Sequence, residues 1–184
     1  FEEIERVSRL FVERFGVEGI RLTGGEPTVR AHLPVLVGKL AALGIDLALS
    51  TNGSTFRSEA AGLREAGLRR VNISLDTLDR AKFEQMTRRD EFDHVMLGIQ
   101  AAKDAGFHQV KINAVVERGV NDDEIVALAR FGRDEGVEVR FIEFMPLDAS
   151  DAWQRATVVG QDEIVAALAA EWPMELVPAR GAAP

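Results

Sequence analysis

The sequence predicts an α/β protein in which parallel strands form a partial (β/α) barrel. The first observation behind this prediction is a repeat. Five times an amphipathic stretch ends in glycine and gives way within a few residues to a strand, at Gly16, Gly44, Gly67, Gly106 and Gly136. Glycine suits the left-handed position that closes a helix. Strands that alternate with helices every ~25 to 40 residues indicate βα units and a parallel sheet.

The individual elements follow from local patterns in chain order. Apolar residues at helical spacing predict a helix at the start of the chain, through Phe1, Ile4, Val7, Leu10 and Phe11. Five strands are expected from Ile20, Leu47, Val71, Val110 and Val139 onward. Helical spacing recurs between the third and fourth strands, at Val95, Ile99 and Ala102. Asn121 and Asp122 are expected to cap a helix that runs through Phe131.

The second observation is that each strand has one apolar and one polar side, because successive side chains point to opposite faces. The expected apolar sides hold Ile20 and Leu22, Leu47 and Leu49, Val71, Ile73 and Leu75, Val110 and Ile112, then Val139 and Phe141. The expected polar sides hold Arg21 and Thr23, Ala48 and Ser50, Asn72, Ser74 and Asp76, Lys111 and Asn113, then Arg140. A parallel sheet covered on both faces reads as continuous apolar runs, so the polar side predicts a barrel with a wet or ligand-filled interior.

Three cations, Arg21, Lys111 and Arg140, come from three different strands on this polar side. Arginine forks and a lysine point charge suit phosphate, so a polyanion is the expected occupant. The alternative is that Arg21 and Arg140 form internal ion pairs with Asp76 or Glu143.

The run Ile20 to Pro27 predicts a strand that delivers a binding loop. Gly24 and Gly25 let the backbone approach a ligand, and the Glu26 carboxylate suits an ammonium group. A plain strand-to-helix connection is the alternative. Further loops at carboxyl ends of strands, where barrels bind ligands, are expected at 50–53, 74–76 and 144–146.

Composition narrows the classes of protein. The 184 residues are 46% hydrophobic, which fits one globular domain over residues 1–184. No apolar run has the length of a membrane span and no leader precedes Phe1, so a cytoplasmic location is expected. The net charge of −8 argues against nucleic-acid and membrane partners. Zero cysteines leave no thiolate ligands for a cluster.

Other candidate residues favour ordinary roles. The three histidines lack metal-ligand spacing, so surface or packing roles are expected for His32, His94 and His108. The acidic run 122–124 is interpreted as a helix start, and 88–90 as a solvated loop. No catalytic or metal-binding residue is assigned.

Six motifs in order resemble the GTP 3′,8-cyclase family of radical S-adenosylmethionine (SAM) enzymes, which begin molybdenum cofactor (molybdopterin) biosynthesis. The motifs are IRLTGGEP (20–27), TNG (51–53), VNISLD (71–76), VKINAVV (110–116), GVNDDEI (119–125) and VRFIEFMP (139–146). The resemblance implies an incomplete six-stranded barrel, of which this chain supplies the second to sixth strands. In that family, SAM and an iron–sulfur cluster generate a radical that starts cyclisation of GTP to (8S)-3′,8-cyclo-7,8-dihydroguanosine 5′-triphosphate.

The resemblance also implies site residues. Gly24, Gly25, Glu26, Ser74 and Met145 would hold SAM. Arg21, Ser50, Lys111 and Arg140 would hold GTP, mainly its triphosphate. An electron donor and a downstream cyclic pyranopterin monophosphate synthase are the implied partners. A homodimer is expected on a separate ground, because the strand at 20–23 lacks its neighbour and leaves an open sheet edge that favours pairing with a second copy.

The chain departs from the family in its cluster ligands. The family binds two 4Fe-4S clusters through cysteines before and after this region, and this sequence has none. The chain is therefore expected to be an internal piece, inactive without the N-terminal cluster loop and the C-terminal extension. Gly19 and Ser50 stand where lysine and threonine are expected. Another radical SAM enzyme and a non-catalytic nucleotide-binding module remain as alternatives.

Overall fold

A computed structural model describes residues 1–145, 154–175 and 177 of the chain. Five parallel strands form one sheet in the order β1-β2-β3-β4-β5. The strands are β1 (Gly19–Leu22), β2 (Asp46–Thr51), β3 (Arg70–Ser74), β4 (Gln109–Val116) and β5 (Glu138–Glu143). All five predicted strands and their parallel arrangement are confirmed.

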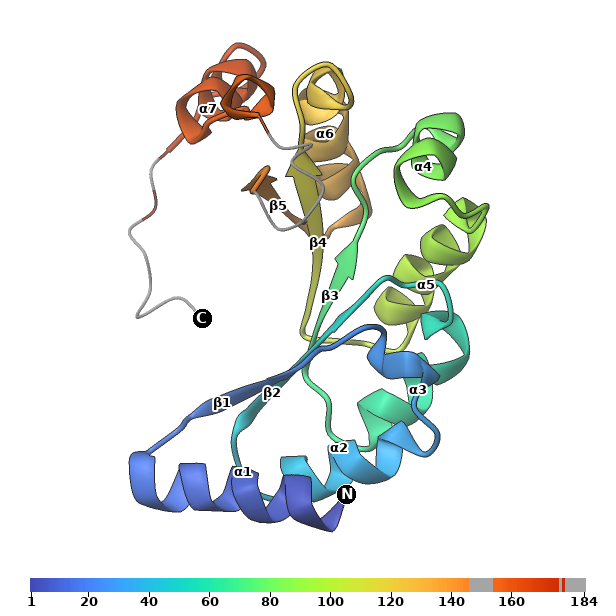
Figure 1. The fold of residues 1–184 in the computed structure, drawn as a ribbon, viewed down its shortest axis with the longest axis vertical. Helices are drawn as coiled ribbons and strands as arrows, with labels where there is room; N and C mark the ends of the chain where they lie inside the picture. The colour runs from blue at the N-terminus through green and yellow to red at the C-terminus, as the bar shows by residue number, and fades with distance from the viewer. Residues whose placement is uncertain (146–153, 176, 178–184) are drawn as a thin grey trace.

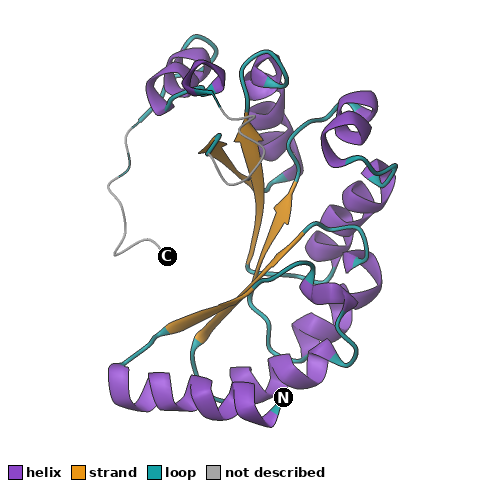
Figure 2. Ribbon diagram, viewed as in Figure 1, coloured by secondary structure: helices purple, strands orange, loops and turns teal. Residues whose placement is uncertain are grey.

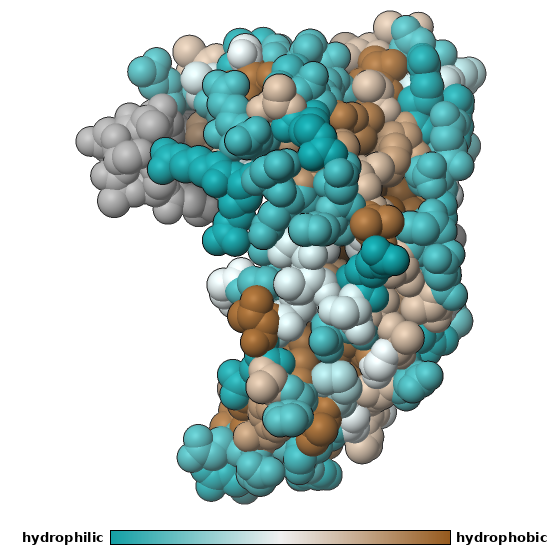
Figure 3. Space-filling view, turned by 90° about the vertical axis from the view of Figure 1, so that its right-hand side faces the viewer, coloured by the Kyte–Doolittle hydropathy of each residue, from teal (hydrophilic) through white to brown (hydrophobic). Residues whose placement is uncertain are grey.

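Most helices lie along one side of the curved sheet, the last helix lies at one end of it, and the opposite side is concave (Figures 1 and 2). The α-helices are α1 (Glu2–Phe15), α2 (Leu33–Ala41), α3 (Phe56–Glu65), α4 (Arg80–Thr87), α5 (Phe92–Asp104), α6 (Ile125–Glu135) and α7 (Gln161–Ala169). Short 3-10 turns are η1 (Pro27–Val29), η2 (Asp122–Glu124) and η3 (Arg155–Thr157). The helical side with α3, α4 and α5 is hydrophilic along its upper part and edge, with hydrophobic residues between (Figure 3).

The apolar sides of the strands form the core with the helices, as their alternation predicts. Leu47, Leu49, Val71, Ile73 and Ile112 are fully buried there. A smaller cluster joins β4 to α6 and α7 through Val116, Ile125, Val159 and Ile164. The sheet therefore presents its other side to the concavity.

The five glycines predicted to end helices all have positive φ, from 65° at Gly16 to 105° at Gly67. This confirms the interpretation of the repeat, because a left-handed residue ends each helix before the next strand begins.

The predicted cap at Asn121 and Asp122 is wrong. The helix α6 begins at Ile125, after the turn η2, and runs to Glu135. Asn121 is fully buried and donates through Nδ2 to the carbonyl oxygens of Asp76 and Val115, at 2.6 and 2.8 Å. Its Oδ1 accepts from the Glu117 amide, so Asn121 joins the ends of β3 and β4 instead of capping a helix.

The first helix is exposed to an unusual degree. None of the residues of α1 is buried, and Phe11 and Phe15 are 48% and 69% exposed. Both outer strands of the sheet, β1 and β5, have only one strand neighbour among the described residues. Within the same residues, no helix combines the length and apolar character needed to cross a bilayer.

Candidate functional site

Strand register brings most of the predicted site residues together. Ser50 pairs with Asn72, Asn72 with Lys111, and Lys111 with Glu138, so these residues form one row across four strands. In the next row, Ser74 pairs with Asn113 and Asn113 with Arg140. These two rows are called the polar strand face below. Arg21 lies on the same face but one row lower, opposite Ala48.

Lys111 and Arg140 share a carboxylate that the sequence analysis did not single out. The Lys111 Nζ lies 2.7 Å from Glu138 Oε1, and the Arg140 Nη2 lies 3.8 Å from the same oxygen. Gln109 Nε2 donates to the other oxygen of Glu138 at 2.7 Å. The Lys111 side chain is only 12% exposed, whereas Glu138 is 44% exposed. The positive charges of Lys111 and Arg140 and the negative charge of Glu138 therefore meet where β4 lies beside β5.

The alternative ion pairs do not form among the described residues. The Asp76 carboxylate accepts from the Val115 amide at 2.8 Å, and the Glu143 carboxylate accepts from the Gln161 amide at 2.8 Å. Arg21 is exposed and has no ion pair within the described ranges. An unpaired guanidinium at the concave side is available to an anionic ligand.

Asn113 adds an unsatisfied acceptor to the polar strand face. Its Oδ1 is buried and has no hydrogen-bond partner among the described residues. Buried polar atoms are normally paired, so an orphan acceptor between Ser74 and Arg140 suits a ligand donor. The sequence places Asn113 on the polar side by alternation alone and gives it no role.

The glycine loop after β1 is open to a ligand. Gly24 has φ +135°, a conformation that side chains disfavour, and a Cβ added at Gly24 or Gly25 would meet no atom within 4 Å. A cavity of about 370 Å³ reaches this loop, lined by apolar residues such as Leu22 and Leu33 as well as by Gly24 and Gly25. The backbone of this loop is therefore open to a ligand.

The Glu26 carboxylate is already occupied by protein donors. Its Oε1 accepts from the Thr28 amide and the Thr28 hydroxyl, at 3.0 and 2.6 Å, and from the Thr51 hydroxyl at 2.7 Å. Its Oε2 accepts from the Asn52 amide at 2.6 Å. The loop is therefore fastened to the carboxyl end of β2.

A second cavity, of about 210 Å³, lies at the carboxyl ends of β2 and β3 and is lined by Asn52, Ser74 and Asp76. Burial raises the pKa of the Asp76 carboxyl, and the hydrogen bond from the Val115 amide offsets part of this effect. Met145, also expected near the cofactor, follows β5 and is 50% exposed. Pro146, the last residue of its motif, lies outside the described residues.

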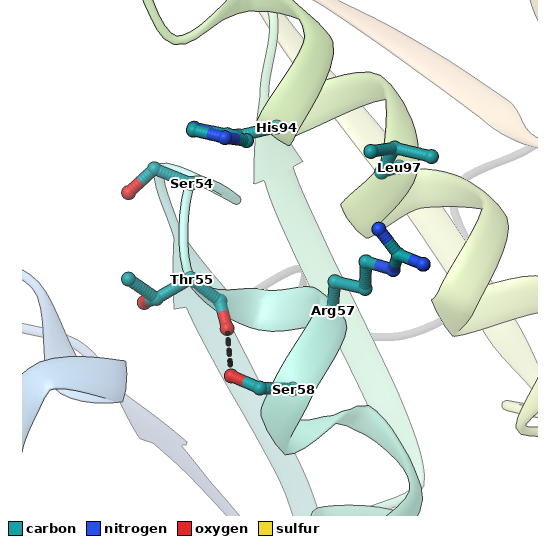
Figure 4. Close-up of a pocket in the computed structure, with 6 residues that line it drawn as sticks. All are labelled: Ser54, Thr55, Arg57, Ser58, His94 and Leu97. Atoms are coloured by element: carbon teal, nitrogen blue, oxygen red, sulfur yellow. Dashed lines mark hydrogen bonds between the residues drawn. The ribbon is translucent and has the colours of Figure 1, made fainter.

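A depression of about 420 Å³ on the helical side contains none of the predicted site residues (Figure 4). Ser54, Thr55, Arg57 and Ser58 line it from the start of α3, and His94 and Leu97 line it from α5. The Ser58 hydroxyl donates to the Thr55 carbonyl at 2.9 Å. This arrangement is consistent with a surface role for His94.

The residues present do not fit an iron–sulfur cluster, because the sequence contains no cysteine thiolate. Within the described ranges, no group of three or more histidine, aspartate or glutamate side chains could hold a metal ion.

The fold and the glycine loop define a class of protein. The chain belongs to the radical SAM superfamily, because the sequence model of that family matches residues 1–132. Solved structures agree in fold. Methylornithine synthase (PylB) superposes with a TM-score of 0.71 and 21% identity, covering 91% of this chain and 51% of that one. TYW1 with a lysine-pyruvate adduct superposes with a TM-score of 0.70 and 17% identity, covering 96% and 63%.

The sequence is also similar to particular enzymes within the superfamily. It is 50% identical to the GTP 3′,8-cyclase of Acidothermus cellulolyticus over 183 residues, which is 98% of this chain and 50% of that protein. The GTP 3′,8-cyclase of Rhodopirellula baltica is 50% identical over 164 residues, 88% of this chain and 46% of that protein. The chain thus spans about half the length of the curated relatives it matches.

Proposed function

We propose that this chain supplies the SAM-binding loop and the triphosphate-binding face of a GTP 3′,8-cyclase. The polar strand face is the observation that carries the proposal. Lys111 and Arg140 come from adjacent strands, and Arg21 lies on the same side of the sheet. Guanidinium and ammonium groups bind phosphate oxygens through charge-assisted hydrogen bonds. The similarity to GTP 3′,8-cyclases supports GTP as the polyanion.

Each site residue has a role in this proposal. Arg21, Lys111 and Arg140 contact the triphosphate, and the Ser50 hydroxyl, in the row of Lys111, adds a neutral donor. Gly24 and Gly25 receive the methionine end of SAM, and Ser74 and Met145 contact the same cofactor. In this superfamily, bound SAM supplies a 5′-deoxyadenosyl radical that abstracts a hydrogen atom from the substrate. The protein residues bind and orient the two molecules so that the ribose of GTP faces SAM.

The location of Ser74 supports this orientation. Ser74, Asn113 and Arg140 are consecutive neighbours across β3, β4 and β5. A cofactor contact and a phosphate contact thus lie two strands apart on one face, with the unsatisfied Asn113 oxygen between them. This spacing supports the proposal that a nucleotide binds next to SAM on the concave side.

The test uses the full-length protein, reconstituted with iron and sulfide without oxygen and supplied with GTP, SAM and a reductant. The proposal predicts both 5′-deoxyadenosine and a cyclised guanosine triphosphate that depends on GTP. Cleavage of SAM without change to GTP would favour a radical SAM enzyme with another substrate. A protein that binds GTP but never cleaves SAM would be a nucleotide-binding module, and the proposal would fail.

A further inference from the structure

We propose that Thr51 is a positioning residue for cofactor binding: its hydroxyl fixes the Glu26 carboxylate, which fastens the glycine loop to β2. The inference rests on the proposed function in one respect, because it takes SAM as the ligand of the loop. It also changes the expected role of Glu26, from a direct partner of an ammonium group to an anchor of the loop.

Protein donors occupy most of the acceptor positions on the Glu26 carboxylate. An ionised carboxylate has about four lone-pair positions. The Thr28 amide, the Thr28 hydroxyl and the Thr51 hydroxyl all donate to Oε1. The Asn52 amide donates to Oε2. Most of the acceptor capacity of Glu26 therefore serves the protein, and at most one position on Oε2 remains for a ligand.

Thr51 is 4% exposed, so its side chain does not contact a ligand on the concave side. Its hydroxyl donates to Glu26 and accepts from the Gly53 amide at 3.0 Å. Both hydrogen-bonding directions of the hydroxyl are used, so its orientation is fixed. Gly53 in turn has φ +81° and lies against Ile73 and Val95, which connects this turn to the core.

The hydrogen-bond network continues to Thr55, at the start of α3. The Thr28 and Thr55 hydroxyls lie 2.6 Å apart. Because the Thr28 hydroxyl donates to Glu26, the Thr55 hydroxyl is the donor in this pair. Thr28 and Thr51 are 7% and 4% exposed, so the hydrogen bonds at the centre of the network are partly shielded from water, whereas Asn52 and Thr55 at its margins are exposed. A Cβ added at Gly24 or Gly25 would meet no atom within 4 Å, so no packing fixes these residues and the anchor at Glu26 sets their position.

The experiment compares Thr51→Val, which keeps the shape of the side chain and removes the hydroxyl, with Thr51→Ser, which keeps the hydroxyl. Both are made in the full-length reconstituted protein. Titration calorimetry measures affinity for SAM and for GTP, and hydrogen exchange without ligand measures opening of residues 24–26. Thr157→Val is the control. Among the described residues, the Thr157 hydroxyl bonds only to the Gln154 carbonyl, and both residues lie far along the chain from the glycine loop.

We expect Thr51→Val to weaken SAM binding about tenfold, the scale of one hydrogen bond to a charged group. GTP affinity should stay within about twofold, Thr51→Ser should restore SAM affinity to within about threefold, and amides 24–26 should exchange faster only in Thr51→Val. If Thr51→Val does not fold, Thr28→Val should give the same split, because its hydroxyl donates to the same oxygen.

Three results would overturn the inference: unchanged SAM affinity in Thr51→Val, an equal loss of SAM and GTP affinity, or a Thr51→Ser variant that resembles Thr51→Val. The proposed function fails differently. In that case the wild-type protein would not bind GTP or would not cyclise it, while the exchange data and the SAM titrations would still test the anchor.

Discussion

The Lys111 ammonium and the Glu138 carboxylate lie 2.7 Å apart on neighbouring strands, and the same carboxylate oxygen faces Arg140. Glu138 therefore lowers the positive charge of the face to which we assign the triphosphate. A carboxylate there both orders the Lys111 side chain and opposes an incoming polyanion. The second effect dominates at low salt, because a highly charged ligand feels the net charge of the whole face.

Glu138→Gln should accordingly tighten GTP binding roughly fivefold at low ionic strength, the scale of about one charge–charge interaction at a wet site. The gain should shrink as salt rises, because screening weakens exposed charges. Titration calorimetry at several salt concentrations measures both effects. Glu135→Gln removes the same charge from a carboxylate that pairs with Lys103 and should leave GTP affinity unchanged. Weaker binding in Glu138→Gln would mean that ordering of Lys111 dominates.

Asp76 predicts a pH dependence of stability. Its pKa is raised by burial, so the folded protein holds this proton to higher pH than the unfolded chain does. The folded state then binds more protons between the two pKa values, and stability falls as pH rises through that window. Asp76→Asn keeps an acceptor for the Val115 amide and removes the buried charge.

The Asp76→Asn variant should therefore be more stable than the wild type at neutral pH. Its free energy of unfolding should also change less with pH on the acid side. Urea unfolding across the pH range measures it. Asp104→Asn is a surface control, because Asp104 accepts only from Gln100 in the described part of the chain. An Asp76→Asn variant less stable than the wild type at neutral pH would show that the ionised form is favoured.

The helix α5 packs closely on the loop after β2 at Gly98. A Cβ at Gly98 would lie 2.6 Å from the Gly53 carbonyl oxygen, a backbone atom that cannot move freely. Gly98→Ala should therefore lower the free energy of unfolding by about 1 to 3 kcal/mol, the usual cost of overpacking. Gly62→Ala is the matched control, since its Cβ would first meet Pro34 at an ordinary 3.7 Å.

The control should be neutral or stabilising by about 1 kcal/mol, because alanine favours a helix interior over glycine. Chemical denaturation measures the free energy of unfolding of both variants. Equal stabilities for the two variants would contradict the close approach of α5 and the loop.

Much of the fold could be predicted because the relevant signals are local. Alternation along each strand gave the buried side at Leu47 and Leu49, and glycine after each helix marked where the next strand begins. The role of Asn121 could not be predicted, because it depends on the carbonyl of Asp76, which is distant in sequence. A local cap and a long-range bridge use the same side chain, and tertiary contacts decide between them.

In the site, too, local patterns could be predicted and contacts between strands could not. The polar side of the strands placed Lys111 and Arg140 on one face, but Glu138 was missed, although it also alternates with Val139 on β5. Its partnership with Lys111 depends on the register of β4 and β5, which sequence alone does not fix. Likewise, Glu26 was interpreted as a free acceptor, because its donors Thr51 and Asn52 belong to another strand and its loop.

Binding of GTP to the full-length protein and to its Lys111→Ala variant tests the central claim most directly. The account predicts that the variant loses about 1.5 to 3 kcal/mol of GTP binding, roughly 10- to 150-fold, the value of a hydrogen bond to a charged group. Affinity for SAM should not change, and Lys103→Ala, on the helical side, should bind both ligands normally. If Lys111→Ala binds GTP as tightly as the wild type, or loses SAM and GTP alike, the polar strand face is not the triphosphate site.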